Sequence, residues 1–100
     1  MNDLETISPE EVKRRLGAGE KLNIIDVREP EEVLQGRIPG AVNIPLGELP
    51  ERHGEIARSG EIILVCRSGN RSQRAYQYLS SLNIPGLRNM TGGMLAWDQL

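Results

Sequence analysis

The segment Glu61-Ile62-Ile63-Leu64-Val65 constrains the fold of this chain more than any other. It is short, apolar and largely β-branched, which is typical of a strand buried on both faces. Residues 22–27, Leu-Asn-Ile-Ile-Asp-Val, form a second run of this kind. Strands buried on both faces occur in parallel sheets that are covered by helices on each side. The two runs therefore predict an α/β fold.

The residues around these runs show helical patterns. Ser8-Pro9-Glu10-Glu11 has the form of a capping box, with Ser8 as N-cap and the side chain of Glu11 returning to the N-cap backbone. Residues 29–36 begin with Glu and Pro and end with Gly, which predicts a short helix. The acidic side chains of this segment, including Glu32, are expected to form a solvated face.

The second half of the chain continues the alternation. From Arg71 onward the apolar spacing predicts an amphipathic helix, whose buried face comprises Ala75, Tyr78, Leu79 and Leu82. Weaker patterns predict strands at 41–44 and 87–90, a broken helix at 46–59 and a terminal helix after Gly92-Gly93. Because strands that alternate with helices pair in parallel, residues 1–100 are expected to form a single domain. Its mostly parallel central sheet should have about five strands, with helices on both faces.

Composition and charge exclude several classes of function. The formal net charge is −2, so no overall positive field draws the protein to nucleic acid or an acidic membrane. No apolar run approaches the roughly 18 residues of a membrane span, and the first residues lack a signal-peptide pattern. One cysteine and one histidine cannot form an internal disulfide or a closed zinc site. We therefore expect a cytoplasmic protein that needs no metal and no cofactor.

The only cysteine, Cys66, directly follows the buried run. Ligands of open α/β sheets bind beyond the carboxyl ends of the strands, and Cys66 lies at such an end, just before the helix that starts near Arg71. Gly69 and Asn70 tolerate positive φ angles, so the loop can curl and direct its N–H groups at one point. N–H groups at a helix N-terminus bind anions. The nearest candidate anion is the sulfur of Cys66 itself.

Three features favour the thiolate of Cys66: the helix N-terminus, the loop amides, and the guanidinium groups of Arg67 and Arg71. Such sites bring a cysteine pKa from about 8.5 into a range of about 3.5–7.5, and the thiolate is the nucleophile. The alternative is a buried structural cysteine, but two nearby arginines do not form an apolar niche. Asp26 and Arg28, at the end of the first buried run, are expected to give structural support as an ion pair.

Four blocks of this sequence resemble the rhodanese homology domain of single-domain sulfurtransferases. They are residues 25–32 (IDVREPEE), 36–45 (GRIPGAVNIP), 66–72 (CRSGNRS) and 92–97 (GGMLAW). The blocks follow the order of the family, and the likeness covers roughly residues 6–98. Any one of them would be a weak signal, whereas four in order are a specific one.

The resemblance implies a rhodanese-like fold and a two-step transfer of sulfur. Cys66 would be the catalytic nucleophile that takes sulfur from a donor such as thiosulfate and holds it as a persulfide. The acceptor would be cyanide in assays and a thiol or a protein in the cell. The expected partners are thus a small anionic sulfur donor and a thiol or protein acceptor. The substrate-binding residues that the likeness implies are Arg67, Ser68, Gly69, Asn70, Arg71 and Ser72.

Two other functions remain as alternatives. Cysteine phosphatases have an arginine six positions after the cysteine, whereas Arg71 follows Cys66 by five. The shorter ring suits a sulfur atom better than a phosphate group, and a phosphatase also needs a positioned general acid. The second alternative is a sulfur-relay or binding module that delivers persulfide sulfur to a dedicated protein partner, because the chain has no second thiol to resolve a persulfide.

Overall fold

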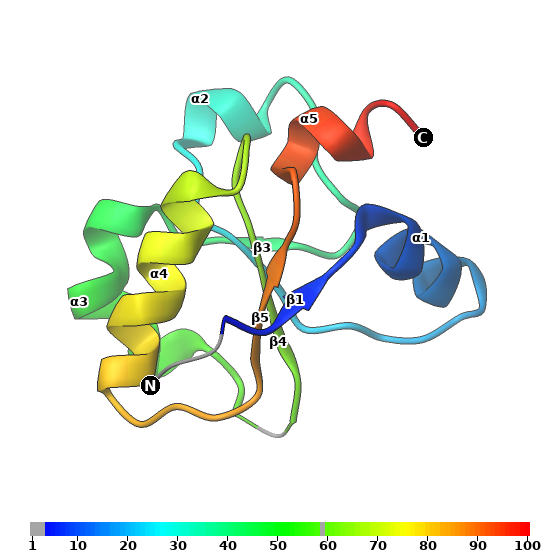
Figure 1. Cartoon of the computed structure of the whole chain (residues 1–100). Helices are drawn as coiled ribbons and strands as arrows, with labels where there is room; N and C mark the ends of the chain where they lie inside the picture. The colour runs from blue at the N-terminus through cyan, green and yellow to red at the C-terminus, as the bar shows by residue number, and fades with distance from the viewer. Residues whose placement is uncertain (1–3, 59) are drawn as a thin grey trace.

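Strands and helices alternate along the chain, as expected (Figure 1). The computed structural model describes residues 4–58 and 60–100. In chain order the elements are β1 (Thr6–Ile7), α1 (Pro9–Gly17), β2 (Ile24–Asp26), α2 (Pro30–Val33), β3 (Val42–Asn43), η1 (Leu46–Glu48), α3 (Leu49–Arg52), η2 (His53–Glu55), β4 (Ile62–Val65), α4 (Asn70–Ser81), β5 (Leu87–Met90) and α5 (Gly93–Trp97). No helix among these described residues is long and apolar enough to cross a membrane.

The five strands form one sheet in the order β1-β5-β4-β2-β3, and each neighbouring pair is parallel. This confirms the expected α/β architecture. The most apolar run became β4, which lies between β5 and β2, and its four residues are all buried. Strand β1 was not predicted, because two residues show too little pattern to identify a strand. Its pairing with β5, where Ile7 faces Met90 in the register, comes from tertiary structure alone.

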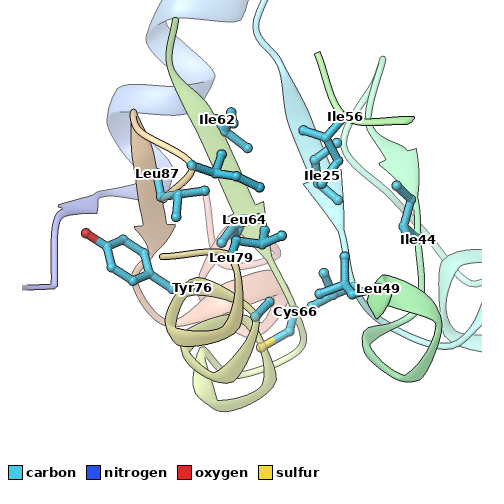
Figure 2. Close-up of a cluster of buried hydrophobic side chains, with 13 residues drawn as sticks. Ile25, Ile44, Leu49, Ile56, Ile62, Leu64, Cys66, Tyr76, Leu79 and Leu87 are labelled. Carbon is cyan, nitrogen blue, oxygen red and sulfur yellow. The ribbon is translucent and has the colours of Figure 1, made fainter. Parts of the chain in front are cut away.

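Helices cover both faces of the sheet, with α3 and α4 on one side and α1 and α5 on the other (Figure 1). The side chains of β4 alternate between two clusters: Ile62 and Leu64 pack toward α4, and Ile63 and Val65 pack toward the opposite face. Figure 2 shows the first cluster, which also contains Cys66 at the end of the strand. This core holds the start of the cysteine loop rigidly.

The buried face of α4 differs from the prediction. Ala75 and Leu79 are buried as expected, and Tyr78 is partly buried and packs against the same cluster, but Tyr76, which was not predicted, is the more deeply buried tyrosine. Leu82 is 38% exposed, because α4 ends at Ser81 and the chain then turns away from the helical path. The physical reason is the tertiary turn after the helix, which the apolar spacing cannot reveal.

One local prediction about a helix also needs correction. Ser8 caps α1 by accepting a hydrogen bond from the Glu11 N–H at 3.1 Å, but the Glu11 carboxylate pairs with Arg14 and does not return to Ser8. An arginine one turn away offers this carboxylate a charge-assisted bond, which is stronger than a bond from a neutral amide. The predicted broken helix at 46–59 is confirmed for the described residues 46–58, which contain three successive helical turns, η1, α3 and η2; residue 59 lies outside the described residues.

Candidate active site

The cysteine loop joins the end of β4 to the start of α4, at the carboxyl edge of the sheet. Gly69 is the N-cap of α4 and has a φ of 107°, a left-handed conformation that favours glycine. Asn70 is already the first helical residue, so only one of the two residues expected to tolerate positive φ adopts it. The positive φ of Gly69 turns its N–H back toward the loop.

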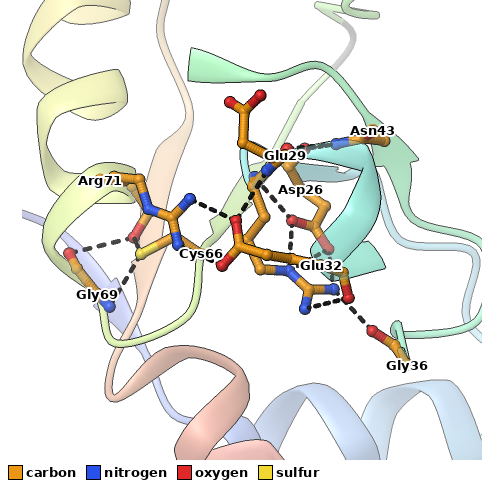
Figure 3. A network of polar contacts seen from close by, with 10 residues as sticks. Asp26, Glu29, Glu32, Gly36, Asn43, Cys66, Gly69 and Arg71 are labelled. Carbon is orange, nitrogen blue, oxygen red and sulfur yellow. Dashed lines mark hydrogen bonds and ion pairs between the residues drawn. The ribbon is translucent and has the colours of Figure 1, made fainter. Parts of the chain in front are cut away.

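The sulfur of Cys66 accepts hydrogen bonds inside this loop (Figure 3). The Gly69 N–H donates to Sγ at 2.9 Å, and the Ser72 hydroxyl lies 3.3 Å from the same atom. Cys66 is only 1% exposed, which by itself would also suit a structural cysteine. Hydrogen-bond donors directed at the sulfur are what a thiolate needs and an apolar filler does not.

These donors change the acidity of the thiol. Burial raises the pKa of Cys66, and the Ser72 hydroxyl is the largest of the contributions that oppose this effect. The backbone N–H groups of Ser72, Gly69 and Ser68 also lower the pKa. Their sum exceeds the cost of burial, so the pKa of Cys66 lies below its ordinary value and the thiolate is favoured.

Helix α5 fixes the other side of the loop. The N–H of Met94 donates to the Cys66 carbonyl at 2.8 Å, and the N–H of Leu95 donates to the Arg67 carbonyl at 2.9 Å. A Cβ at Gly93 would lie 2.5 Å from both carbonyl oxygens, closer than real atoms approach. The missing side chain of Gly93 therefore lets α5 approach the cysteine loop closely enough to hold it, whereas a Cβ at Gly92 would clash with Ala96 of α5 itself.

The two arginines of the loop have different surroundings. Arg71 forms a two-pronged ion pair with the Glu32 carboxylate, at 2.6 and 2.8 Å (Figure 3). The bond to Arg71 is the main reason that the pKa of Glu32 is lowered to about 2. Glu32 is thus tied to the cysteine loop, and the prediction that it belongs to a solvated face was wrong. Arg67 is exposed and has no ion-pair partner among the residues that the structure describes.

Asp26 and Arg28 form a buried ion pair at the end of β2, beside β4. The Arg28 guanidinium bonds both carboxylate oxygens of Asp26 and also donates to the carbonyls of Glu32 and Gly36. These contacts hold α2 against the sheet, so that Glu32 can reach Arg71. The contacts fit the structural role that the sequence suggested for the pair.

The remaining predicted site residues lie at different depths. Ser72 is fully buried, whereas the side chains of Ser68 and Asn70 are exposed. A hollow of about 270 Å³ lies beside the loop, between α2 and α5, and Arg67, Glu32 and Met94 are among its lining residues. The structure therefore provides an open space next to the loop, with the free guanidinium of Arg67 on its wall.

Sequence reasoning missed Asn89, a buried polar residue of β5 whose side chain contacts both Ser72 and Gly69. The available signal was a polar amide next to Met90 in the short predicted strand 87–90. Only the pairing of β5 with β4, in which Asn89 faces Leu64 in the register, brings it beneath the cysteine loop.

Comparison with known proteins agrees with this geometry. The Rhodanese-like domain family matches residues 8–100. YtwF of Bacillus subtilis is 40% identical over 96% of this chain and 92% of its own length. A sulfurtransferase of Allochromatium vinosum is 36% identical over 91% of this chain and 85% of its own length. The human single-domain sulfurtransferase TSTD1 has a similar structure, with a TM-score of 0.80 and 30% identity over 97% of each chain. The chain therefore belongs to the rhodanese-like domain family.

Proposed function

We propose that the protein is a sulfurtransferase that uses thiosulfate or a similar anionic sulfane-sulfur donor and forms a persulfide on Cys66. The observation that supports this most directly is the convergence of the Gly69 N–H and the Ser72 hydroxyl on the Cys66 sulfur. A sulfur anion held by fixed donors is both a ready nucleophile and a stable resting form for transferred sulfur.

The first step forms one S–S bond and breaks another. The Cys66 thiolate attacks the outer sulfur of thiosulfate, and the bond between the two thiosulfate sulfurs breaks with its electron pair leaving on sulfite. The products are a persulfide with one negative charge and sulfite with two, which balances the three charges of the reactants. No oxidant or reductant is consumed.

Binding of the anionic donor needs positive charge near the sulfur. Arg67 is exposed, has no ion-pair partner among the described residues, and lines the hollow beside the loop. We assign it the role of contacting the donor. Arg71 is engaged with Glu32, so we assign it a smaller role, in which it favours the anionic sulfur by its charge.

The second step discharges the persulfide. A thiolate or cyanide attacks the outer sulfur, the new bond forms to the acceptor, and the electron pair of the broken S–S bond returns to Cys66 as thiolate. The chain contains no other cysteine, so the acceptor must be an external molecule. This favours as the second candidate function a relay in which a partner protein accepts the sulfur. A reducing compartment such as the cytoplasm suits either cycle, because it keeps the thiol free.

Intact-protein mass spectrometry tests the proposal. Incubation with thiosulfate should add the mass of one sulfur atom to the protein, and cyanide should remove it again with formation of thiocyanate. Cys66→Ser is the matched control, since it keeps the volume of the side chain nearly unchanged, and it should show neither the adduct nor turnover. If the wild-type protein gains no sulfur from any anionic donor in a panel, the persulfide mechanism is wrong.

A further inference from the structure

A small buried polar cluster lies beneath the cysteine loop, where β5 meets α4. Ser72 is 0% exposed and Asn89 is 5% exposed. The hydroxyl oxygen of Ser72 has three acceptors within hydrogen-bond distance: Asn89 Oδ1 at 2.5 Å, the Gly69 carbonyl at 3.2 Å and Cys66 Sγ at 3.3 Å. A serine hydroxyl has only one proton to donate, so these three acceptors compete for it.

The Gly69 carbonyl depends least on the Ser72 proton, because other donors already satisfy it. It already accepts a hydrogen bond from the Gln73 N–H at 3.2 Å and lies 3.4 Å from the Asn89 side-chain nitrogen. The competition is therefore between Asn89 Oδ1 and the sulfur of Cys66.

The orientation of the Asn89 amide sharpens this competition. Its nitrogen faces the Gly69 carbonyl, so its oxygen must face Ser72. In the reverse orientation two oxygen atoms, Oδ1 and the Gly69 carbonyl, would face each other with no proton between them. Among residues 4–58 and 60–100, Ser72 is the only donor to Asn89 Oδ1. Because buried polar groups are almost always satisfied, Asn89 holds the hydroxyl proton as long as the sulfur is neutral.

The balance changes when the sulfur becomes negative. A hydrogen bond to an ionised acceptor is roughly twice as strong as one between neutral groups. A thiolate or persulfide on Cys66 would then attract the hydroxyl proton, and Asn89 Oδ1 would lose its donor. The free energy by which the Ser72 hydroxyl stabilises the sulfur anion is thus reduced by the cost of leaving the buried Asn89 Oδ1 without a donor.

We propose that Asn89 is a positioning residue that competes with the Cys66 sulfur for the hydroxyl proton of Ser72, and so limits how strongly the loop stabilises the sulfur anion. The inference deepens the proposed function and rests on it, because the sulfur must change charge during the cycle. A limit of this kind is useful, since the attacking thiol works best when its pKa is near the ambient pH and loses nucleophilicity when the pKa is much lower.

The charged groups around Cys66 do not obscure this effect. Arg67 belongs to the same loop, Arg71 of α4 is paired with Glu32 of α2, and the ion pair at the end of β2 is complete within itself. From β5 and α5, the groups that bond or touch the loop are Asn89, Gly93, Met94 and Leu95, which are uncharged. Two carboxylates, Glu31 of α2 and Asp98 at the end of α5, line the hollow beside the loop together with Arg67. Substitutions at Asn89 and Ser72 leave all of these charges in place. A change in the pKa of Cys66 in such variants therefore reports the hydrogen bond from the Ser72 hydroxyl.

The test is the pH dependence of alkylation of Cys66 by iodoacetamide, which measures the thiol pKa without any sulfur donor. Asn89→Ala should lower the pKa of Cys66 by about half a unit to one unit, the range of one redirected hydrogen bond. Ser72→Ala should raise it. In the Ser72→Ala background, Asn89→Ala should have no further effect, because no proton is left to compete for.

Two results would overturn the inference: an unchanged or raised pKa in Asn89→Ala, or the same downward shift with and without Ser72. A merely structural Asn89 would give one of these. If Asn89→Ala fails to fold by circular dichroism, Asn89→Leu fills a similar volume without an acceptor and is judged by the same criteria. Because alkylation needs no persulfide, failure here is distinct from failure of the mass experiment that tests the proposed function.

Discussion

The carboxyl ends of β2 and β4 are neighbours in the sheet and both lead into helices, yet their polar groups serve different ends. At β2, the guanidinium of Arg28 is satisfied by Asp26 and by two backbone carbonyls. At β4, donors converge on the sulfur of Cys66, and Arg67 is left without an ion-pair partner among the described residues. At β2 every polar group has a partner, so the contacts stabilise the structure. At β4 the donors converge on one sulfur atom, so they stabilise its anion and make it reactive. The contacts at the end of β2 position α2, and α2 in turn places Glu32 where it can pair with Arg71 beside the cysteine loop.

The largest effect on stability is expected from breaking the ion pair of Asp26 and Arg28 at the end of β2. Arg28→Met would leave the buried Asp26 carboxylate without its counter-charge, and such a change costs about 3–5 kcal/mol of unfolding free energy. Urea unfolding measures this loss. The double variant Asp26→Asn/Arg28→Met removes both charges and should recover most of the stability. If the single variant is as stable as the wild type, the pair does not support the fold.

The next effect concerns the contact between α5 and the cysteine loop. Gly93→Ala combines a left-handed φ of 57° with a clash against the carbonyls of Cys66 and Arg67, and should cost about 1–3 kcal/mol. It should also slow alkylation of Cys66 by displacing the loop. Gly40→Ala is the control, because Gly40 has a φ of 83° but nothing within 4 Å of an added Cβ. Equal losses in the two variants would show that the clash is unimportant.

The free arginine of the β4 region should matter for the donor and not for the fold. Arg67→Ala should raise the KM for thiosulfate about tenfold, in the range of one lost charge-assisted bond, with unchanged unfolding free energy. Use of a neutral donor should change less. Arg74→Ala, an exposed arginine further along α4, is the matched control and should change neither quantity. Equal losses for anionic and neutral donors would mean that Arg67 only shapes the loop.

The smallest effect is expected from the link between the two regions, the pair of Glu32 with Arg71. Glu32→Gln should cost at most about 1 kcal/mol at neutral pH, since the pair is partly exposed and screened by water. The pKa of Glu32 is lowered from 4.5 to about 2, so its contribution is complete above 4.5 and is lost as the pH falls through about 2.

Acid unfolding curves check this window. The stability difference between the wild type and Glu32→Gln should therefore shrink between pH 4.5 and pH 2. Glu55→Gln breaks an exposed pair far from the loop and controls for general charge effects. A difference that stays constant down to pH 2 would contradict the assigned role of the carboxylate.

The sequence alone determined the class of fold and the position of the reactive group. Apolar runs such as Ile62–Val65 can only be buried between two helical layers, and a cysteine that follows such a run lies at the carboxyl edge of the sheet. The sequence also predicted local structure that depends only on residues close together in the chain. Examples are the serine that caps α1 and the glycine at the N-cap of α4.

Only the tertiary structure decided which distant groups meet at that edge. Glu32 and Arg71 are far apart in the chain, and Asn89 reaches Ser72 because β5 pairs with β4. Sequence periodicity reports which face of an element is apolar, but it does not report register or the direction of a helix across the sheet. Those depend on how all the elements pack together, and they determine which donors, carboxylates and amides surround the sulfur of Cys66.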